Sequence, residues 1–170
     1  MRIVLGFQGC GKTYLSERSE EKYGLTCRDM DFKYFDHHTD WVKDYVDEVL
    51  EQDGYDIVFC NISRELINEL LSRDISFTVV APMQDRCSGA EYQAIKEMLF
   101  GRYVLRKTQT PQNVGWIEKL KANFDSWTDY EFFKECEDND NVLLLPLTPQ
   151  YNTMESVLMP DIWCLNLKET

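Results

Sequence analysis

The chain has 170 residues, of which 44% are hydrophobic and 28% charged, with 8 Gly and 5 Pro. This length fits one domain with one core, and the composition excludes disordered, fibrous and repeat proteins. The formal net charge of −12 disfavours extended binding to nucleic acid or anionic lipid, because such binding requires a basic face. Only residues 1–28 and 84–107 are net positive, so we expect a compact anion to bind there.

Short apolar runs alternate along the chain with longer amphipathic stretches, which predicts an α/β fold with a buried parallel sheet. The runs expected to form strands are Arg2–Gly6, Leu25–Arg28, Asp56–Cys60, Ser76–Ala81 and Asn141–Leu147. The expected helices are Thr13–Lys22, Asp40–Gln52, one capped by Ser63, Gly89–Phe100, Asn113–Cys136 and a short one around Asn152–Leu158. Pro111 breaks the helical pattern between the fourth and fifth of these helices.

The sequence predicts a cytosolic protein with reduced thiols. No segment approaches the roughly 18 apolar residues of a membrane span, and the opening apolar run is too short for a signal-peptide core. The six cysteines include no Cys-x-x-Cys pair, which excludes a zinc ribbon and a thioredoxin-like redox motif. The adjacent His37 and His38 have no partner cluster nearby in the sequence, so a solvated loop is favoured there over a metal site.

The residues from Gly6 to Thr13, GFQGCGKT, match the P-loop pattern G-x-x-x-x-G-K-[ST] in full. The motif follows an apolar run and opens a helix, so that backbone N–H groups of a glycine-rich loop converge on one phosphate. Lys12 would then bridge the β- and γ-phosphates, and the Thr13 hydroxyl would bind Mg²⁺.

Two acids, Asp29 and Asp31, follow the second predicted strand. The carboxyl ends of parallel strands face the ligand crevice, and side chains two apart on an extended segment point the same way. One carboxylate can orient Mg²⁺-bound water, while the other grips the phosphoryl acceptor or accepts its hydroxyl proton. Acids are frequent in this chain, so a pair of solvated loop acids is the alternative.

Three arginines, Arg86, Arg102 and Arg106, fall in the second net-positive stretch. Arg102 and Arg106 are four residues apart and share a face if the segment is helical. Guanidinium groups on a mobile lid stabilise the charge of a transferred phosphoryl group and help to exclude water. The alternative is solvated helix charge paired with Glu91 and Glu97.

Other features of the sequence narrow the class of protein. Asn61 follows the third predicted strand, where many P-loop ATPases carry an acid, which disfavours a motor, a helicase or a GTPase. The stretch from 32 to 54 contains no arginine to grip an acceptor phosphate, which disfavours a nucleoside monophosphate as the acceptor.

Together these residues resemble the small P-loop kinases of the adenylate-kinase-like group, and more closely the compact nucleotide-kinase-like proteins of bacteriophages. The resemblance rests on Gly6–Thr13, on Asp29-x-Asp31, and on Arg102-x-x-x-Arg106 followed by an aromatic helix with Trp116, Phe124 and Trp127. It implies one three-layer domain over residues 1–170 with a parallel sheet of strand order 2-3-1-4-5. It also implies ATP and Mg²⁺ as cofactors and a helical lid at about 84–112, between strands four and five.

The expected function is transfer of the ATP γ-phosphoryl group to a small acceptor, a nucleoside or a nucleotide. The expected catalytic residues are Lys12, Asp29, Asp31, Arg102 and Arg106, and the expected Mg²⁺ ligands are Thr13 and Asp29. The expected nucleotide-binding residues are Gly6, Gln8, Gly9, Cys10, Gly11, Lys12, Thr13, Tyr14 and Arg86. Two alternatives stay open: a polynucleotide 5′-hydroxyl kinase, which Arg28-Asp29 also resembles, and a module that binds ATP without turning it over.

Overall fold

The computed structural model describes the fold of residues 1–31, 40–107 and 114–166. Its strands are β1 (Arg2–Gly6), β2 (Cys27–Met30), β3 (Ile57–Asn61), β4 (Phe77–Ala81) and β5 (Val142–Pro146). Its helices are α1 (Lys12–Tyr23), α2 (Trp41–Leu50), α3 (Arg64–Ser72), α4 (Gly89–Lys107), α5 (Val114–Asn123), α6 (Tyr130–Glu137) and α7 (Met154–Asn166), with a 3₁₀ turn η2 (Gln84–Arg86).

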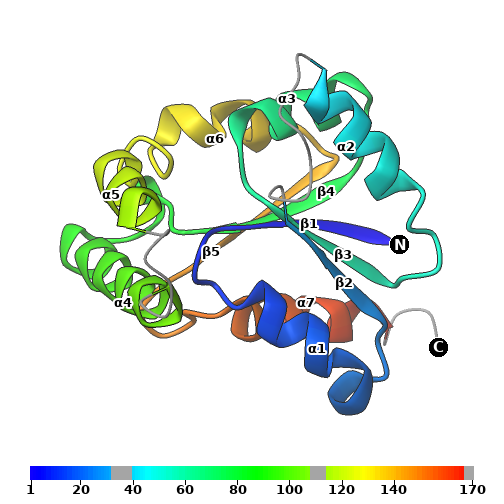
Figure 1. Ribbon diagram of the computed structural model, residues 1–170, viewed down its shortest axis with the longest axis horizontal. Coiled ribbons are helices and arrows are strands. Elements are labelled where there is room, and N and C mark those ends of the chain that lie inside the picture. Colours follow the sequence, from blue (N-terminus) through cyan, green and yellow to red (C-terminus); the bar gives the residue numbers. More distant parts are fainter. Residues whose placement is uncertain (32–39, 108–113, 167–170) are drawn as a thin grey trace.

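The five strands form one sheet in the order β2-β3-β1-β4-β5, and every neighbouring pair is parallel. This confirms the predicted α/β class, the parallel sheet and its strand order. Figure 1 shows α1 and α7 on one face of the sheet and α2, α3 and α6 on the other, while α4 and α5 lie beyond the carboxyl end of β1. β4 is buried along its whole length, as a central strand covered on both faces should be.

The register of the central strands brings their carboxyl ends together. Gly6 of β1 lies beside Asn61 of β3 and beside Val80 of β4, and Met30 of β2 lies beside Cys60 of β3. Residues that directly follow β1, β2 and β3 therefore share one edge of the sheet, which is where open parallel sheets bind ligands.

The second strand begins and ends two residues later than the sequence predicts. Thr26 donates from its backbone N and from Oγ1 to Asp56 Oδ2, at 2.8 and 2.9 Å, and this pairing fixes where β2 starts along β3. Cys27 consequently pairs with Ile57, and Asp29 lies within the strand rather than after it.

The predicted helix over Asn113–Cys136 is wrong, because the structure contains two helices there. The hydroxyl of Thr128 donates to the carbonyl of Phe124 at 2.8 Å, and Asp129 Oδ1 accepts from the backbone N of Phe132 at 2.9 Å, so a turn and a new N-cap interrupt the helix. α4 and α7 continue beyond their predicted ends. Pro111 lies outside the described residues.

The predicted cap of α3 is confirmed, since Ser63 Oγ accepts from the backbone N of Leu66 at 3.1 Å. Within the described ranges, no helix combines the length and the apolar character needed to cross a membrane.

Candidate functional site

The segment Gly6–Thr13 leaves β1, turns sharply and starts α1. Gly9 and Gly11 have φ angles of 82° and 100°, in the left-handed region that only glycine adopts freely. Gly11 is also the N-cap residue of α1, and the first turn of that helix carries no acid. The start of α1 therefore presents a positive end of the helix dipole to this loop, as a phosphate site requires.

Neighbouring elements hold the Gly6–Thr13 loop on two sides. The backbone N of Met154, at the start of α7, donates to the carbonyl of Cys10 at 2.7 Å. A Cβ atom on Gly9 would lie 3.0 Å from the carbonyl oxygen of Leu99 in α4. The loop is thus packed between α4 and α7, and Gly9 is required by space as well as by φ, whereas Gly11 is required by φ alone.

Lys12 folds back over the loop. Its Nζ donates to the carbonyl of Gly6 at 2.8 Å, and the side chain is buried. A Cβ atom on Gly6 would lie 2.9 Å from two carbons of the Lys12 side chain. The ammonium group is therefore held within the concave side of the loop, the place from which it could reach a bound phosphate.

Thr13 and Asp29 are brought together, as the sequence predicts. Thr13 Oγ1 donates to Asp29 Oδ2 at 2.5 Å, and the other carboxylate oxygen, Oδ1, is buried and has no hydrogen-bond partner within the described structure. A buried polar atom without a partner costs about 1–3 kcal/mol. The hydroxyl and the free oxygen are hard oxygen ligands, so the pair fits Mg²⁺ and its bound water.

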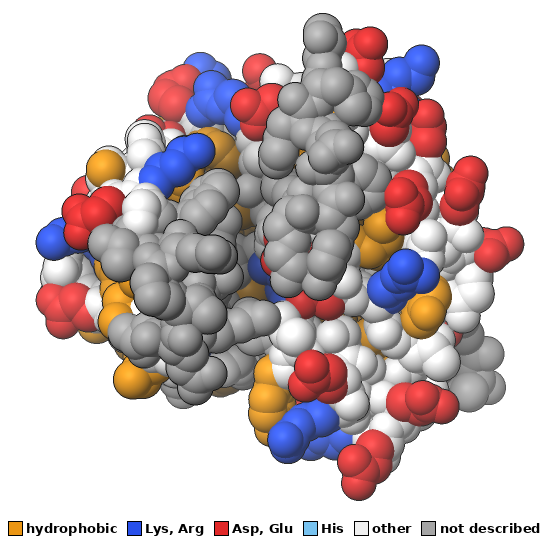
Figure 2. All heavy atoms as spheres, in the orientation of Figure 1, with side chains coloured by type: hydrophobic (Ala, Val, Ile, Leu, Met, Phe, Trp, Pro, Cys, Tyr) orange, Lys and Arg blue, Asp and Glu red, His pale blue; other side chains and the backbone are white. Residues whose placement is uncertain are grey.

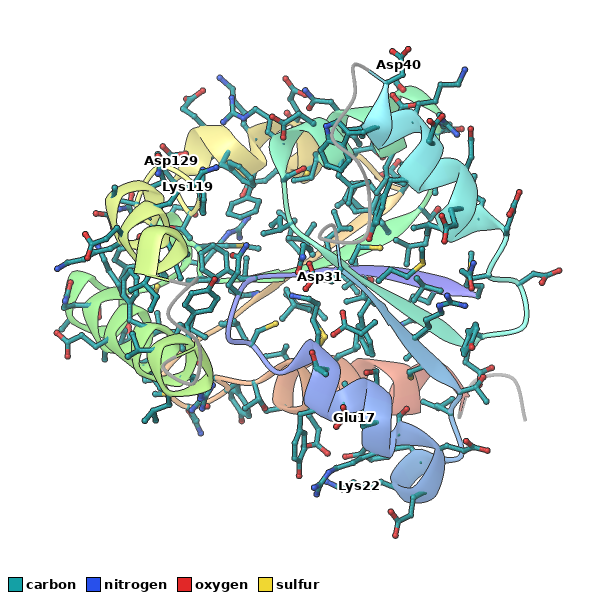
Figure 3. The ribbon with its side chains drawn as sticks, in the orientation of Figure 1. Glu17, Lys22, Asp31, Asp40, Lys119 and Asp129 are labelled. Atoms are coloured by element: carbon teal, nitrogen blue, oxygen red, sulfur yellow. The ribbon has the colours of Figure 1, made fainter. Side chains whose placement is uncertain are left out.

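Asp31 lies next to this pair and is held by an amide. Asn61 Nδ2 donates to Asp31 Oδ1 at 2.9 Å. Asn61 ends β3 beside Gly6, so the hydrogen bond ties the end of β2 to the strand edge that carries the loop. Figure 3 shows Asp31 near the centre of the molecule, at this edge of the sheet. Asn61 stands where many P-loop ATPases carry an acid. In this chain it instead positions Asp31, the acid that follows the neighbouring strand β2.

Two buried groups beside the acids are held neutral. Burial raises the pKa of the Cys10 thiol, in spite of the opposing effect of Lys12. Burial also raises the pKa of the Tyr45 hydroxyl, which donates to the carbonyl of Met30 at 2.7 Å and so fixes the end of β2. The thiol and the hydroxyl therefore add no charge beside Lys12 and the two aspartates.

Arg102 reaches the loop from the outer side. Its Nη1 donates to the backbone carbonyl of Asn152 at 2.6 Å, and its Nη2 donates to the Asn152 side chain. The guanidinium group lines a cavity of about 320 Å³ together with residues from the loop, from α1 and from the start of α7. Those residues are Gly9, Cys10, Gly11, Tyr14, Thr153 and Glu155.

The other two arginines differ from Arg102 in their surroundings. Arg86 forms ion pairs with Glu137 and, at 3.3 Å, with Asp85, and within the described structure no hydrogen bond or ion pair joins it to the loop. Arg106 belongs to α4, but its side chain lies outside the described residues. Of the two predicted clamp residues whose side chains are described, the structure brings Arg102 to the loop and pairs Arg86 with Glu137.

A second and larger cavity, of about 480 Å³, touches the loop at Gln8. The start of α3 contributes Arg64 and Glu65. Lys119 comes from α5, Trp127 from the turn between α5 and α6, and Phe132 from α6. Sequence reasoning placed the acceptor region between Asp31 and Tyr55 and missed this cavity. The polar residues Asn61, Ser63 and Arg64, at and just after the end of a buried strand, are the signal that could have found its α3 wall.

Within the described residues, no group of three or more His, Cys, Asp and Glu side chains could hold a metal ion by itself. Mg²⁺ needs fewer protein ligands than that, because it keeps several waters and binds substrate phosphates. Comparison with protein families, with curated proteins and with solved structures finds no match to this chain.

Proposed function

We propose that this protein is a phosphotransferase that moves the γ-phosphoryl group of ATP to a nucleoside or nucleotide acceptor in the presence of Mg²⁺. One observation carries the proposal: Thr13, in a glycine loop at the start of a helix, donates to the half-buried Asp29, whose second oxygen is buried and has no partner in the described structure. A loop with a purely structural role gives no reason for such an oxygen, whereas a hydrated divalent cation satisfies it.

Each residue of the site has a separate role in the proposed reaction. The backbone N–H groups of the loop and Lys12 hold the phosphates of ATP, and Thr13 and Asp29 hold Mg²⁺ with its water. Mg²⁺ held by these residues would supply positive charge to the phosphate oxygens during the transfer. Asp31, fixed by Asn61, binds the acceptor and takes the proton of a hydroxyl acceptor.

Arg102 is proposed to bind ATP on the outer side of the loop. Its cavity contains Gly9, Cys10 and Gly11, so a nucleotide with its phosphates in the loop extends into that space. The exposed ring of Tyr14 and the amide of Asn152 lie at or beside the same cavity. An aromatic face and a polar amide are groups that proteins use to bind a base.

The experiment measures ADP release from ATP and Mg²⁺ with a panel of nucleosides, nucleoside monophosphates, small hydroxy acids and a 5′-hydroxyl oligonucleotide. The wild type is compared with Lys12→Ala and with Lys121→Ala, an exposed lysine on α5 that serves as the matched control. We expect release that depends on one acceptor class, is lost in Lys12→Ala and persists in Lys121→Ala. ATP turnover that survives in Lys12→Ala would overturn the proposal.

Two other outcomes correspond to the two alternatives. ATP binding without ADP release for any acceptor would indicate a nucleotide-binding module. Release with the oligonucleotide that falls steeply with salt would indicate a polynucleotide kinase. The charge of −12 opposes the second outcome, and Figure 2 shows Asp and Glu side chains spread over the described part of one face, with no continuous patch of Lys and Arg.

A further inference from the structure

We propose that Tyr45, a buried tyrosine of α2, is a positioning residue for the candidate site: its hydroxyl holds the main chain between Asp29 and Asp31 and thereby sets where the two carboxylates lie. The inference rests on the proposed function, which gives the two acids their roles. Tyr45 has an exposed fraction of 0%, so it acts through the segment that carries the acids and touches no substrate itself.

Each of the two acids is held at its side chain by a residue of another element. Thr13, in α1, donates to Asp29 at 2.5 Å, and Asn61, at the end of β3, donates to Asp31 at 2.9 Å. These two hydrogen bonds fix the ends of the carboxylate side chains. The distance and the angle between the carboxylates also depend on the main chain that joins the two residues.

The Tyr45 hydroxyl holds that main chain. It donates to the carbonyl of Met30 at 2.7 Å, and Met30 is the residue between the two acids. A peptide group is planar, so a fixed carbonyl also fixes the N–H and the Cα atom of Asp31. β2 is an edge strand and pairs with β3 alone among the described strands. The hydrogen bond from α2, which lies over one face of the sheet (Figure 1), gives the end of this edge strand a second support.

The burial of Tyr45 indicates a role for its hydroxyl beyond packing. A phenylalanine would fill the same space without burying a polar group, and a buried hydroxyl is unfavourable unless it is hydrogen-bonded. Trp41 packs edge-on against the Tyr45 ring, with the centroids 6.4 Å apart, which restricts the ring and so aims the hydroxyl. Burial also raises the pKa of Tyr45, so the hydroxyl stays protonated and remains a donor at neutral pH.

The exact position of the acids matters for both of their proposed roles. Asp29 has one buried oxygen without a partner in the described structure, and this oxygen can hold Mg²⁺-bound water only if it faces the cation. Asp31 can take a proton only from a group within hydrogen-bond reach. A displacement of about 1 Å in a catalytic site can cost roughly a hundredfold in rate. A loosened main chain should therefore slow the transfer more than it weakens the binding of ATP.

The experiment compares Tyr45→Phe with Tyr92→Phe as its matched control. Each change removes one hydroxyl from a buried tyrosine and keeps the ring, and the Tyr92 hydroxyl contacts Asp125 and Thr128 instead of the end of β2. The kinetic readout is kcat and the KM for ATP at saturating Mg²⁺, with the acceptor that the panel above identifies.

A second readout needs no turnover. Electron paramagnetic resonance measures the affinity for Mn²⁺ in the presence of ADP, and Asp29→Asn identifies which bound Mn²⁺ belongs to the candidate site. Thermal unfolding followed by circular dichroism records the stability of both tyrosine variants, because the loss of a buried hydroxyl affects stability wherever it occurs.

We expect both tyrosine variants to fold and to lose a similar amount of thermal stability, about 1–6 °C. Tyr45→Phe alone should lower kcat, by about tenfold, while the KM for ATP changes by less than about twofold. It should also weaken the Asp29-dependent binding of Mn²⁺ by about threefold or more, because Asp29 is then less firmly held. Tyr92→Phe should keep the wild-type kcat and the wild-type affinity for Mn²⁺.

The outcomes separate this inference from the proposed function. Asp29-dependent Mn²⁺ binding that Tyr45→Phe weakens, without ADP release for any acceptor, would support the role of Tyr45 and overturn the kinase proposal. Turnover and Mn²⁺ binding that Tyr45→Phe changes no more than Tyr92→Phe does would support the kinase and overturn this inference. A wild type with neither ADP release nor Asp29-dependent Mn²⁺ binding would overturn both.

Discussion

Replacing Gly6 by alanine tests whether the end of β1 has to be a glycine. A Cβ atom there would lie 2.3 Å from Met154 Cε and 2.9 Å from Lys12 Cγ and Cδ, whereas carbon atoms normally pack at about 3.5–4.0 Å. Met154 has an exposed fraction of 0%, so its methyl group has no solvent to move into. Overpacking of this kind costs about 1–3 kcal/mol, which lowers the melting temperature of a domain of this size by roughly 2–12 °C.

Thermal unfolding followed by circular dichroism measures the change, with Gly101→Ala as the control. Gly101 lies in α4, where an added Cβ would meet nothing within 4 Å, so that variant should gain about 0.5–1 kcal/mol from helix propensity. The proposed ATP binding should weaken in Gly6→Ala, because the added methyl group displaces the side chain of Lys12. Unfolding of Gly6→Ala at the wild-type temperature would refute the packing argument.

A double-mutant cycle isolates the contact. Met154→Ala removes a buried side chain and should cost about 2–5 kcal/mol by itself. Combined with Gly6→Ala it should cost less than the sum of the two single changes, by about 1 kcal/mol or more, because the new methyl group then enters vacated space. Additive costs would show that the clash is relieved elsewhere.

Three further predictions concern stability and reactivity. Hydrogen bonds from Thr26 lower the pKa of Asp56 from its ordinary 3.8, so this carboxylate stabilises the fold above that pH and ceases to do so as the pH falls through its lower folded value. In urea unfolding, Asp56→Ala should therefore differ from the wild type more at pH 6 than at pH 2.5, and an equal difference at the two pH values would contradict this role. Asp129→Ala should cost about 1 kcal/mol by uncapping α6, and Asp129→Asn only a fraction of that, because an amide oxygen also caps; equal losses would contradict the capping role. Burial raises the pKa of Cys60 to about 12, so iodoacetamide at pH 8 should label this thiol in denaturant but not in the folded protein, as mass spectrometry can check; labelling of the native chain would contradict its burial.

The sequence predicted a loop or a helix end correctly where the signal lay within the few residues that form it. The loop between β1 and α1 and the cap at Ser63 agree with the structure, because glycine spacing and helix caps act over a few residues. The start of β2 depends instead on Thr26 and Asp56, which are 30 residues apart, so periodicity alone placed it two residues early. The cap at Asp129 also had a local signal, an aspartate at a favoured N-cap position. The amphipathic pattern continues on both sides of it, however, and this pattern predicted one uninterrupted helix.

The candidate site was also predictable only in part, because some of its contacts follow a general rule of sheet topology and others join distant segments. The contact between Thr13 and Asp29 follows from the rule that ligands bind at the carboxyl ends of parallel strands. The cavity beside Gln8 joins that residue to Trp127, far along the chain, and no rule of spacing connects them. Arg86 illustrates the converse, because its charge suggested a phosphate clamp and the fold instead pairs it with Glu137.

The hydrogen bond from Met154 to Cys10 has an entropic consequence for any ligand of the loop. Contacts from α4 and α7 fix the loop during folding, so its backbone has little freedom left to lose when an anion arrives. Affinity at such a preorganised site depends on the stability of the surrounding helices as well as on the atoms that touch the ligand. A substitution in α7 that loosens Met154 would weaken binding while every phosphate-contacting residue stays unchanged, and the loss would appear as a less favourable binding entropy.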